Sequence, residues 1–238
     1  MKATWTLDTR THSKWERLVQ ENRHKPIPKD RQRRNVDRKG INISKERVWR
    51  TFVACQITTQ QRSGANSPVA AFMKSDSRAL SLSACSASRK LTGLLEAEFE
   101  SFRFGSKNAE NLTQILHYLS DGGWQVLMPH LKAIRRDPVA QKERLAVQHL
   151  SSGVYPGLGP KQSRNFLQAL GLSRFEVPID SRVLSVMREL GSNFVPSPKG
   201  LGDEVVYRFV QDGLQQISQS LGIYPCMLDA CIFASIED

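Results

Sequence analysis

The chain has 238 residues, 39% of them hydrophobic, so it can bury a sizeable core and is not a wholly disordered chain. Its longest apolar runs are about five residues, far short of the ~20 of a membrane-spanning helix, and four scattered cysteines exclude a disulfide scaffold. The net charge of +11 is concentrated in residues 1–50, which carry 15 Lys and Arg against 6 Asp and Glu. We therefore expect an intracellular protein without a secretory signal, and the basic excess indicates a polyanionic partner.

Residues 1–43 are predicted to form a basic N-terminal arm. Their densest cluster, Lys29-Asp30-Arg31-Gln32-Arg33-Arg34, would release counterions from phosphate groups. A solvated tail without a partner explains the same charge equally well.

The rest of the chain is predicted to be helical almost throughout. Apolar residues recur at i, i+3, i+4 and i+7, as in Leu112, Ile115, Leu116 and Leu119, which is the stripe of an amphipathic helix. No run shows the alternation of a strand, and Gly and Pro residues separate the segments. The expected helices span 44–61, 66–74, 77–101, 108–120, 124–135, 138–151, 161–170, 181–190, 203–221 and 225–236.

A glycine-rich turn stands at the centre of segment 150–170. One helix ends before Tyr155-Pro156-Gly157-Leu158-Gly159, and another begins near Lys161. The two glycines allow a left-handed backbone and a close approach of a ligand, and the free amides of the next helix favour an anion. The turn is therefore either a phosphate-binding hairpin or an ordinary connection between helices.

Asp180 is a candidate N-cap for the helix that follows Pro178-Ile179. It lies 19 residues after Lys161, with one helix and one turn between them. Two successive helices joined in this way place their N-termini at the same opening. Asp180 is then either a cap alone or a carboxylate that also faces Lys161.

Taken together, Tyr155 to Lys161 and Ile179-Asp180-Ser181-Arg182-Val183 resemble the motif of the helix-hairpin-helix DNA glycosylases. Arg182 stands where that family commonly has His. The resemblance covers residues 44–238 and implies an all-α fold of the HhH-GPD type, with two helical subdomains flanking a DNA-binding cleft and the hairpin at 150–170.

The resemblance implies base excision through a lysine. Lys161 would attack C1′ of the sugar of a flipped nucleotide, and Asp180 would stabilise the oxocarbenium charge. Arg164 or Arg182 would help the lysine amine to lose its proton. A phosphate contact is the simpler role for Lys161, but family members without lyase activity lack a lysine there, so its presence favours a glycosylase that is also an AP lyase.

Further site residues are also implied by the resemblance. A Gln pair at the end of an early helix would fill the gap left by the flipped base, although an exposed polar helix end explains it too. A polar residue near the C-terminus and the aromatic four residues later would form the base pocket, although the aromatic also fits a core stripe. The implied base-binding residues are Asp229, Phe233 and Asn165, and the implied DNA-binding residues are Gln60, Gln61, Gly157, Gly159, Gln162 and Arg182.

No cofactor is expected, because the chain lacks the four closely spaced cysteines of an iron–sulfur cluster and its five histidines have no zinc spacing. A monovalent cation in the hairpin is compatible with the resemblance. The expected partner is double-stranded DNA with a damaged base, bound by a monomer without a membrane, in the cytoplasm and nucleoid or in a nucleus.

The leading hypothesis is a glycosylase and AP lyase for an oxidised purine, 8-oxoguanine, since an ionised Asp229 would accept from N1–H and the N2 amino group of guanine. A glycosylase for oxidised pyrimidines and a non-catalytic helix-hairpin-helix DNA-binding module are the alternatives.

Overall fold

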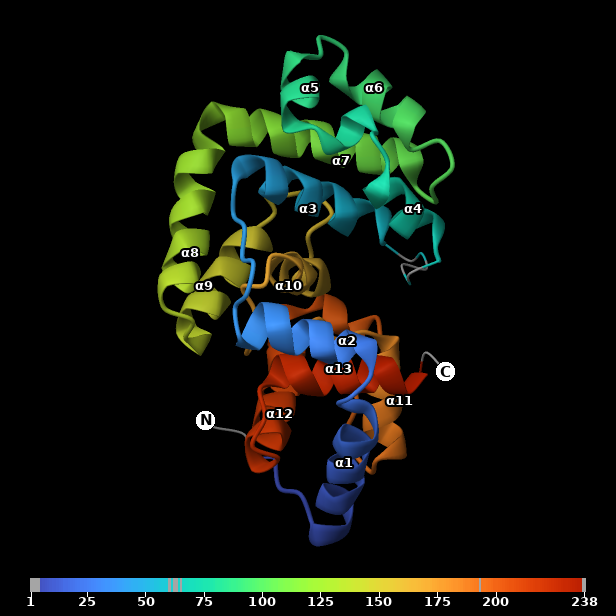
Figure 1. Ribbon diagram of the computed structural model, residues 1–238, viewed down its shortest axis with the longest axis vertical. Coiled ribbons are helices and arrows are strands. Elements are labelled where there is room, and N and C mark those ends of the chain that lie inside the picture. The colour runs from blue at the N-terminus through green and yellow to red at the C-terminus, as the bar shows by residue number, and fades with distance from the viewer. Residues whose placement is uncertain (1–4, 60, 62–63, 65, 193, 237–238) are drawn as a thin grey trace.

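The computed structural model describes residues 5–59, 61, 64, 66–192 and 194–236, which form two helical lobes along the longest axis of the molecule (Figure 1). All regular secondary structure in these residues is helical, which confirms the predicted all-α class.

The first lobe contains the middle of the chain. Its helices are α3 (Lys45–Ile57), α4 (Pro68–Lys74), α5 (Leu82–Ala87), α6 (Leu91–Glu98), α7 (Gly105–Tyr118), α8 (Trp124–Arg136), α9 (Ala140–Leu150) and α10 (Pro160–Ala169), with shorter turns at Arg78–Leu80 and Leu119–Gly123. Phe52 of the central α3 is fully buried and packs against Tyr155 and Phe166, with ring centroids 5.3 and 4.5 Å away. The core thus fixes α10 and the turn before it on α3.

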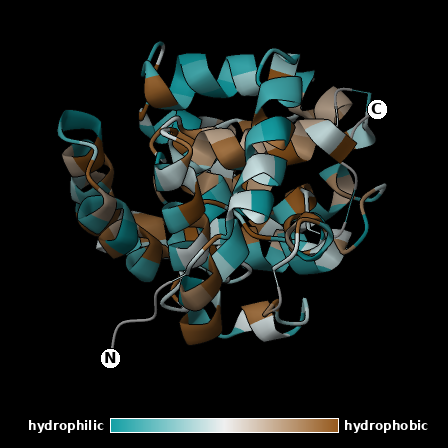
Figure 2. Ribbon diagram, turned by 90° about the horizontal axis from the view of Figure 1, so that it is seen from below, coloured by the Kyte–Doolittle hydropathy of each residue, from teal (hydrophilic) through white to brown (hydrophobic). Residues whose placement is uncertain are grey.

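The second lobe combines the two ends of the chain. Its helices are α1 (Thr9–Asn22), α2 (Pro26–Arg31), α11 (Ser181–Glu189), α12 (Glu204–Ser220) and α13 (Pro225–Ile236), with a π-helical turn at Gln32–Val36 and a 3-10 turn at Gly200–Gly202. Most helices mix hydrophobic and hydrophilic positions along their length (Figure 2). Within the described part of the chain, no single helix is long and apolar enough to cross a membrane, although α12 and α13 pass that test as a pair bent by 95°.

The N-terminal segment differs from the predicted arm. α1 and α2 both lie against α13, and Trp15 of α1 is fully buried in the core of the second lobe. The reason is an apolar stripe of Trp15, Leu18 and Val19, which the surrounding basic residues obscure in the sequence. Residues 5–43 are therefore part of the folded protein.

The predicted helices agree with the observed ones within four residues at each end, except at 77–101. There the chain breaks into a 3-10 turn and two short helices. The oxygens of Ser77 and Ser81 accept hydrogen bonds from the amides of Ala79 and Ala84, so each serine starts a new helix. Serine competes with the helical backbone in this way, and the apolar pattern alone does not reveal it.

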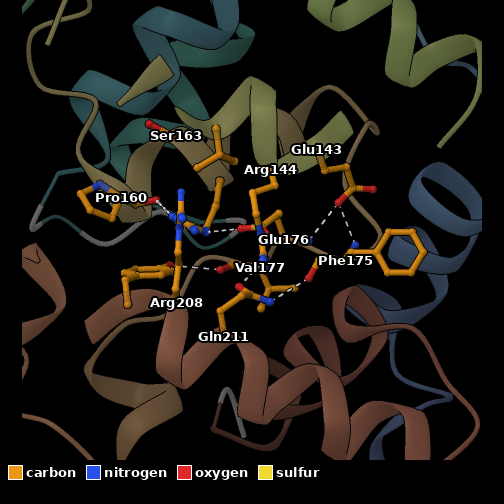
Figure 3. Close-up of polar contacts among 12 residues, drawn as sticks. Glu143, Arg144, Pro160, Ser163, Phe175, Glu176, Val177, Arg208 and Gln211 are labelled. Carbon is orange, nitrogen blue, oxygen red and sulfur yellow. Dashed lines mark hydrogen bonds and ion pairs between the residues drawn. The ribbon is translucent and has the colours of Figure 1, made fainter. Parts of the chain in front are cut away.

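A buried carboxylate holds the strap that leads from α10 to α11. Glu143 of α9 is fully buried and accepts hydrogen bonds from the amides of Phe175 and Glu176 at 2.8 and 2.9 Å (Figure 3). It also accepts one from the amide of Arg174 at 2.8 Å. Burial raises the pKa of Glu143 to about 7, although these amide bonds lower it. The strap is therefore fixed to the first lobe before it enters the second.

A buried arginine joins the two lobes. Arg164 of α10 is fully buried and donates to Glu176 of the strap at 2.8 Å and to Glu204 of α12 at 3.0 Å. Its guanidinium also lies 4.1 Å from the ring centroid of Tyr207. Of the two arginines that were expected near Lys161, Arg164 is thus engaged by two carboxylates, whereas Arg182 lies beside Asp180, which Lys161 also contacts.

Candidate active site

A cleft of about 1570 Å³ lies between the two lobes, which exceeds an ordinary small-molecule pocket of roughly 300–1,000 Å³. α2, the end of α3, α10, the start of α11 and α13 all contribute to its walls. The predicted site residues that line it are Gln61, Lys161, Asn165, Asp180, Arg182, Asp229 and Phe233.

Buried side chains hold the turn between α9 and α10 against the first lobe. Leu158 is buried, and the ring of His149 lies 3.0 Å from the hydroxyl oxygen of Tyr155. Gly157 has a φ of +82°, and an added Cβ would lie 2.4 Å from the Oε1 atom of Gln56. Both the backbone conformation and the close packing therefore require glycine at position 157.

Gly159 serves a different purpose. Its φ is −75°, so only one of the two glycines has the predicted left-handed backbone. It is the N-cap of α10 without a side-chain cap, and an added Cβ would meet nothing within 4 Å. Among the described residues, the amides of Lys161 and Gln162 have no acceptor. The start of α10 thus presents free N–H groups to open space, which favours an anion.

Lys161 and Asp180 come together at the cleft. The Nζ atom of Lys161 lies 3.5 Å from Oδ2 of Asp180, and the Asp180 side chain is only 16% exposed. Oδ1 of Asp180 accepts from the amides of Arg182 and Val183 at 2.9 and 3.3 Å, which caps α11. The structure therefore contains both the predicted cap and the predicted juxtaposition, one on each carboxylate oxygen.

Arg182 binds Oδ2 of Asp180, the oxygen that does not cap α11. Its Nη2 and Nε atoms lie 2.7 and 3.1 Å from Oδ2. Burial raises the pKa of Asp180, but the hydrogen bond from Arg182 and the charge of Lys161 outweigh it, so the pKa lies below its usual value. Asp180 is thus an ionised carboxylate between two cations.

Asp229 is an acid on α13 whose side chain is only 12% exposed. Its Oδ2 atom accepts from Nε2 of Gln168 at 2.8 Å and from Nη1 of Arg31 at 3.1 Å. Burial raises its pKa to about 6, against the lowering effect of the Arg31 charge. The sequence predicted a base-binding role for Asp229 but neither of its hydrogen-bond partners. Arg31 and Gln168 lie 198 and 61 residues away in the chain, so no local pattern relates them to Asp229.

Phe233 lies one helical turn beyond Asp229. The guanidinium of Arg182 lies 4.3 Å from the centroid of its ring. One face of the ring therefore carries a cation, and Arg182 connects the aromatic to Asp180. The side chain of Arg182 is 44% exposed, so it lies at the open side of the cleft.

The remaining predicted residues have mixed outcomes. Asn165 donates to Oε1 of Gln162 at 2.7 Å, and Gln162 in turn donates to the carbonyl of Cys55 at 3.0 Å. The Gln162 side chain is only 9% exposed and joins α10 to α3, so a contact of this residue with DNA would be made by its free backbone amide. Gln61 accepts from the amide of Arg103 at 3.2 Å, and Gln60 lies outside the described residues.

In the described part of the chain, no cluster of three or more His, Cys, Asp or Glu side chains could hold a metal ion. All four cysteines are free and buried. Burial raises the pKa of the Cys55 thiol to about 12, so this thiol stays protonated.

Solved structures of two other proteins share this two-lobed helical fold. The 8-oxoguanine DNA glycosylase of Methanocaldococcus jannaschii has a similar structure, with a TM-score of 0.69 and 17% identity over 93% of each chain. That of Thermotoga maritima has a TM-score of 0.68 and 17% identity over 95% of this chain and 97% of its own. The sequence matches no protein-family model and no curated protein. The fold that the motif predicted is therefore confirmed by structure.

Proposed function

We propose that the protein is a DNA glycosylase and AP lyase that removes 8-oxoguanine from double-stranded DNA. The observation that carries the proposal is the 3.5 Å contact between Lys161 and the half-buried Asp180 in a cleft that also holds Asp229. The two similar structures are both described as 8-oxoguanine DNA glycosylases, which supports this substrate.

The backbone of the DNA binds at the start of α10. The free amides there and the positive end of the helix dipole receive a phosphate next to Gly159. A flipped nucleotide from this strand enters the cleft, so that its sugar lies between Lys161 and Asp180 and its base lies toward Asp229.

Lys161 is the nucleophile of the proposed reaction. Its side chain is 41% exposed, and Nζ first gives a proton to solvent. The neutral amine then attacks C1′ while the C1′–N9 bond breaks, and the base leaves with that electron pair and takes up a proton that the newly bound nitrogen releases. The ionised Asp180 stabilises the positive charge that develops on the sugar. Opening of the sugar ring gives a Schiff base between Nζ and C1′. Loss of a proton from C2′ then expels the 3′ phosphate and breaks the strand, and none of these steps needs a cofactor.

Borohydride trapping tests the proposal and separates its alternatives. Reduction of the Schiff base joins the protein covalently to DNA, so duplexes with 8-oxoguanine, thymine glycol or an abasic site are compared side by side. Trapping on the 8-oxoguanine and abasic duplexes supports the proposal. Trapping on thymine glycol alone among the base lesions favours the oxidised-pyrimidine glycosylase, and binding without trapping on any duplex favours a non-catalytic module.

A further inference from the structure

Arg31 brings the N-terminal segment into the base pocket. This residue ends α2, its side chain is 18% exposed, and both it and Asp229 line the cleft. Asp229 is its one hydrogen-bond or ion-pair partner among the described residues. Arg31 therefore lines the cleft of the folded protein and does not extend from it on a separate arm.

The contacts of the pair leave a donor and an acceptor free. Both hydrogen bonds to Asp229 go to Oδ2, so no partner among the described residues occupies Oδ1. The guanidinium has five N–H groups, and only Nη1 is engaged with Asp229. Gln168 completes the arrangement, because its Nε2 atom fixes the carboxylate at 2.8 Å.

We propose that Arg31 and Asp229 together read the Watson–Crick edge of a guanine-type base. Arg31 donates to O6, and Oδ1 of Asp229 accepts from N1–H and the N2 amino group. This inference rests on the proposed function, and it makes Arg31 a specificity-determining residue in the same pocket.

The pair discriminates between bases because the positions of donors and acceptors differ. An adenine-type base places an amino group against the guanidinium and the N1 acceptor against the carboxylate, so both contacts become repulsive. A cytosine-type base has the same two faults at N4 and N3. A thymine-type base matches at O4 and N3–H but places O2 against the carboxylate, and a hypoxanthine-type base lacks only the contact at N2. The expected order of excision is 8-oxoguanine, then 8-oxohypoxanthine, then 8-oxoadenine.

The salt bridge also prepares the pocket before the base arrives. A buried carboxylate without a partner is costly, and the guanidinium offsets that cost. The geometry then holds acceptor and donor in place, so that the base replaces water without moving the protein.

The test is the excision rate of Arg31→Ala in the full chain, with Arg33→Ala as its matched control. Arg33 carries the same charge two residues away, but it is 55% exposed, pairs with Asp30 and does not line the cleft. Single-turnover rates are measured on duplexes with 8-oxoguanine, 8-oxoadenine or an abasic site. Arg31→Gln is a second variant, because its amide still donates to Asp229 and keeps the fold.

We expect both Arg31 variants to lose about 10- to 100-fold in 8-oxoguanine excision, the effect of losing one hydrogen bond from a charged group to the base. Cleavage of abasic DNA has no base to read, so its rate stays within about twofold, and Arg33→Ala matches the wild type on every duplex. An equal loss on all duplexes, or equal effects of the Arg31 and Arg33 variants, would overturn the inference while the proposed function stands. A wild-type protein that is inactive on both 8-oxoguanine and abasic DNA would overturn the proposed function as well.

Discussion

Lys161 approaches the one oxygen of Asp180 that is not used to cap α11, at a distance of 3.5 Å. The two carboxylate oxygens therefore have separate tasks, since Oδ1 fixes the helix and Oδ2 faces the cations of the cleft. This division makes the chemical role of each residue separable from its structural role by substitution.

Lys161→Gln should abolish borohydride trapping and strand cleavage. The amide of Gln cannot form a Schiff base, whereas binding of duplex DNA, measured by fluorescence anisotropy, should change little because the backbone amides of α10 remain. Lys107→Gln is the control, because Lys107 is 67% exposed, pairs with Glu110 and lies outside the cleft. Normal trapping by Lys161→Gln would place the nucleophile elsewhere.

Asp180→Asn should slow excision by about 100-fold, the effect of losing one electrostatic stabiliser. Asn keeps an oxygen for the amides of α11, so the free energy of unfolding should change by less than about 1 kcal/mol. Asp203→Asn is the matched control, because Asp203 caps α12 through the amides of Val205 and Val206 at 2.7 and 3.1 Å but is exposed outside the cleft. Near-normal activity of Asp180→Asn would reduce Asp180 to a cap.

The contact of Lys161 and Asp180 could be predicted because the information is local. A glycine turn, one helix and one N-cap within 25 residues determine where both side chains lie. The pairing of Arg31 with Asp229 could not, because the two residues are 198 positions apart and no periodicity relates them. The packing of the Gln162 side chain on α3 could not be predicted either, because a polar residue that faces a neighbouring helix has the same pattern as one that faces solvent. The spacing of Trp15, Leu18 and Val19 at i, i+3 and i+4 is the signal in the sequence that indicates α1.

The N-terminal segment is predicted to be required for folding and not only for binding. Trp15→Ala should lower the free energy of unfolding by about 3–5 kcal/mol, because it empties a fully buried site in the second lobe. Its Nε1 atom has no hydrogen-bond partner among the described residues, which favours the lower end of that range. Urea denaturation measures the change, with Lys14→Ala as an exposed neighbour for comparison. A stable Trp15→Ala variant would show that α1 is a dispensable arm.

Base excision should fall in acid before abasic cleavage does. Burial raises the pKa of Asp229 to about 6, with the charge of Arg31 acting in the opposite direction, and Asp180, Arg182 and Lys161 contribute further charges. Below that pH the protonated carboxyl no longer accepts from N1–H and the N2 amino group. The ratio of 8-oxoguanine excision to abasic cleavage, measured from pH 5 to 8, should therefore fall as the pH drops through about 6.

The same group gives a stability test with a defined sign. The folded pKa of Asp229 lies above its model value of 3.8, so the folded state binds the proton more tightly. Its contribution to stability is then largest below about pH 4 and is lost as the pH rises through about 6. Asp229→Asn should remove this dependence from the denaturation profile and should lose 8-oxoguanine excision at every pH. A ratio of the two activities that is flat with pH in the wild type would exclude an ionised Asp229 as the base reader.

Substitution of the two glycines before α10 should have different effects: Gly157 is required for stability and Gly159 for DNA binding. Gly157→Ala should destabilise the protein by about 1–3 kcal/mol, because φ is +82° and the new Cβ would lie 2.4 Å from Gln56. Gly159→Ala should leave stability unchanged, because its φ is −75° and a Cβ meets nothing within 4 Å.

The Cβ of Gly159→Ala would nevertheless project into the open space at the start of α10. If a phosphate approaches there, the Kd for duplex DNA should rise by roughly tenfold, which corresponds to the loss of about one hydrogen bond to a charged group. Gly202→Ala is the control, since its Cβ also meets nothing within 4 Å but Gly202 does not precede the free amides of α10. Anisotropy titrations and thermal denaturation of the three variants separate binding from folding. Unchanged DNA affinity in Gly159→Ala would show that the open space before α10 does not receive the DNA backbone.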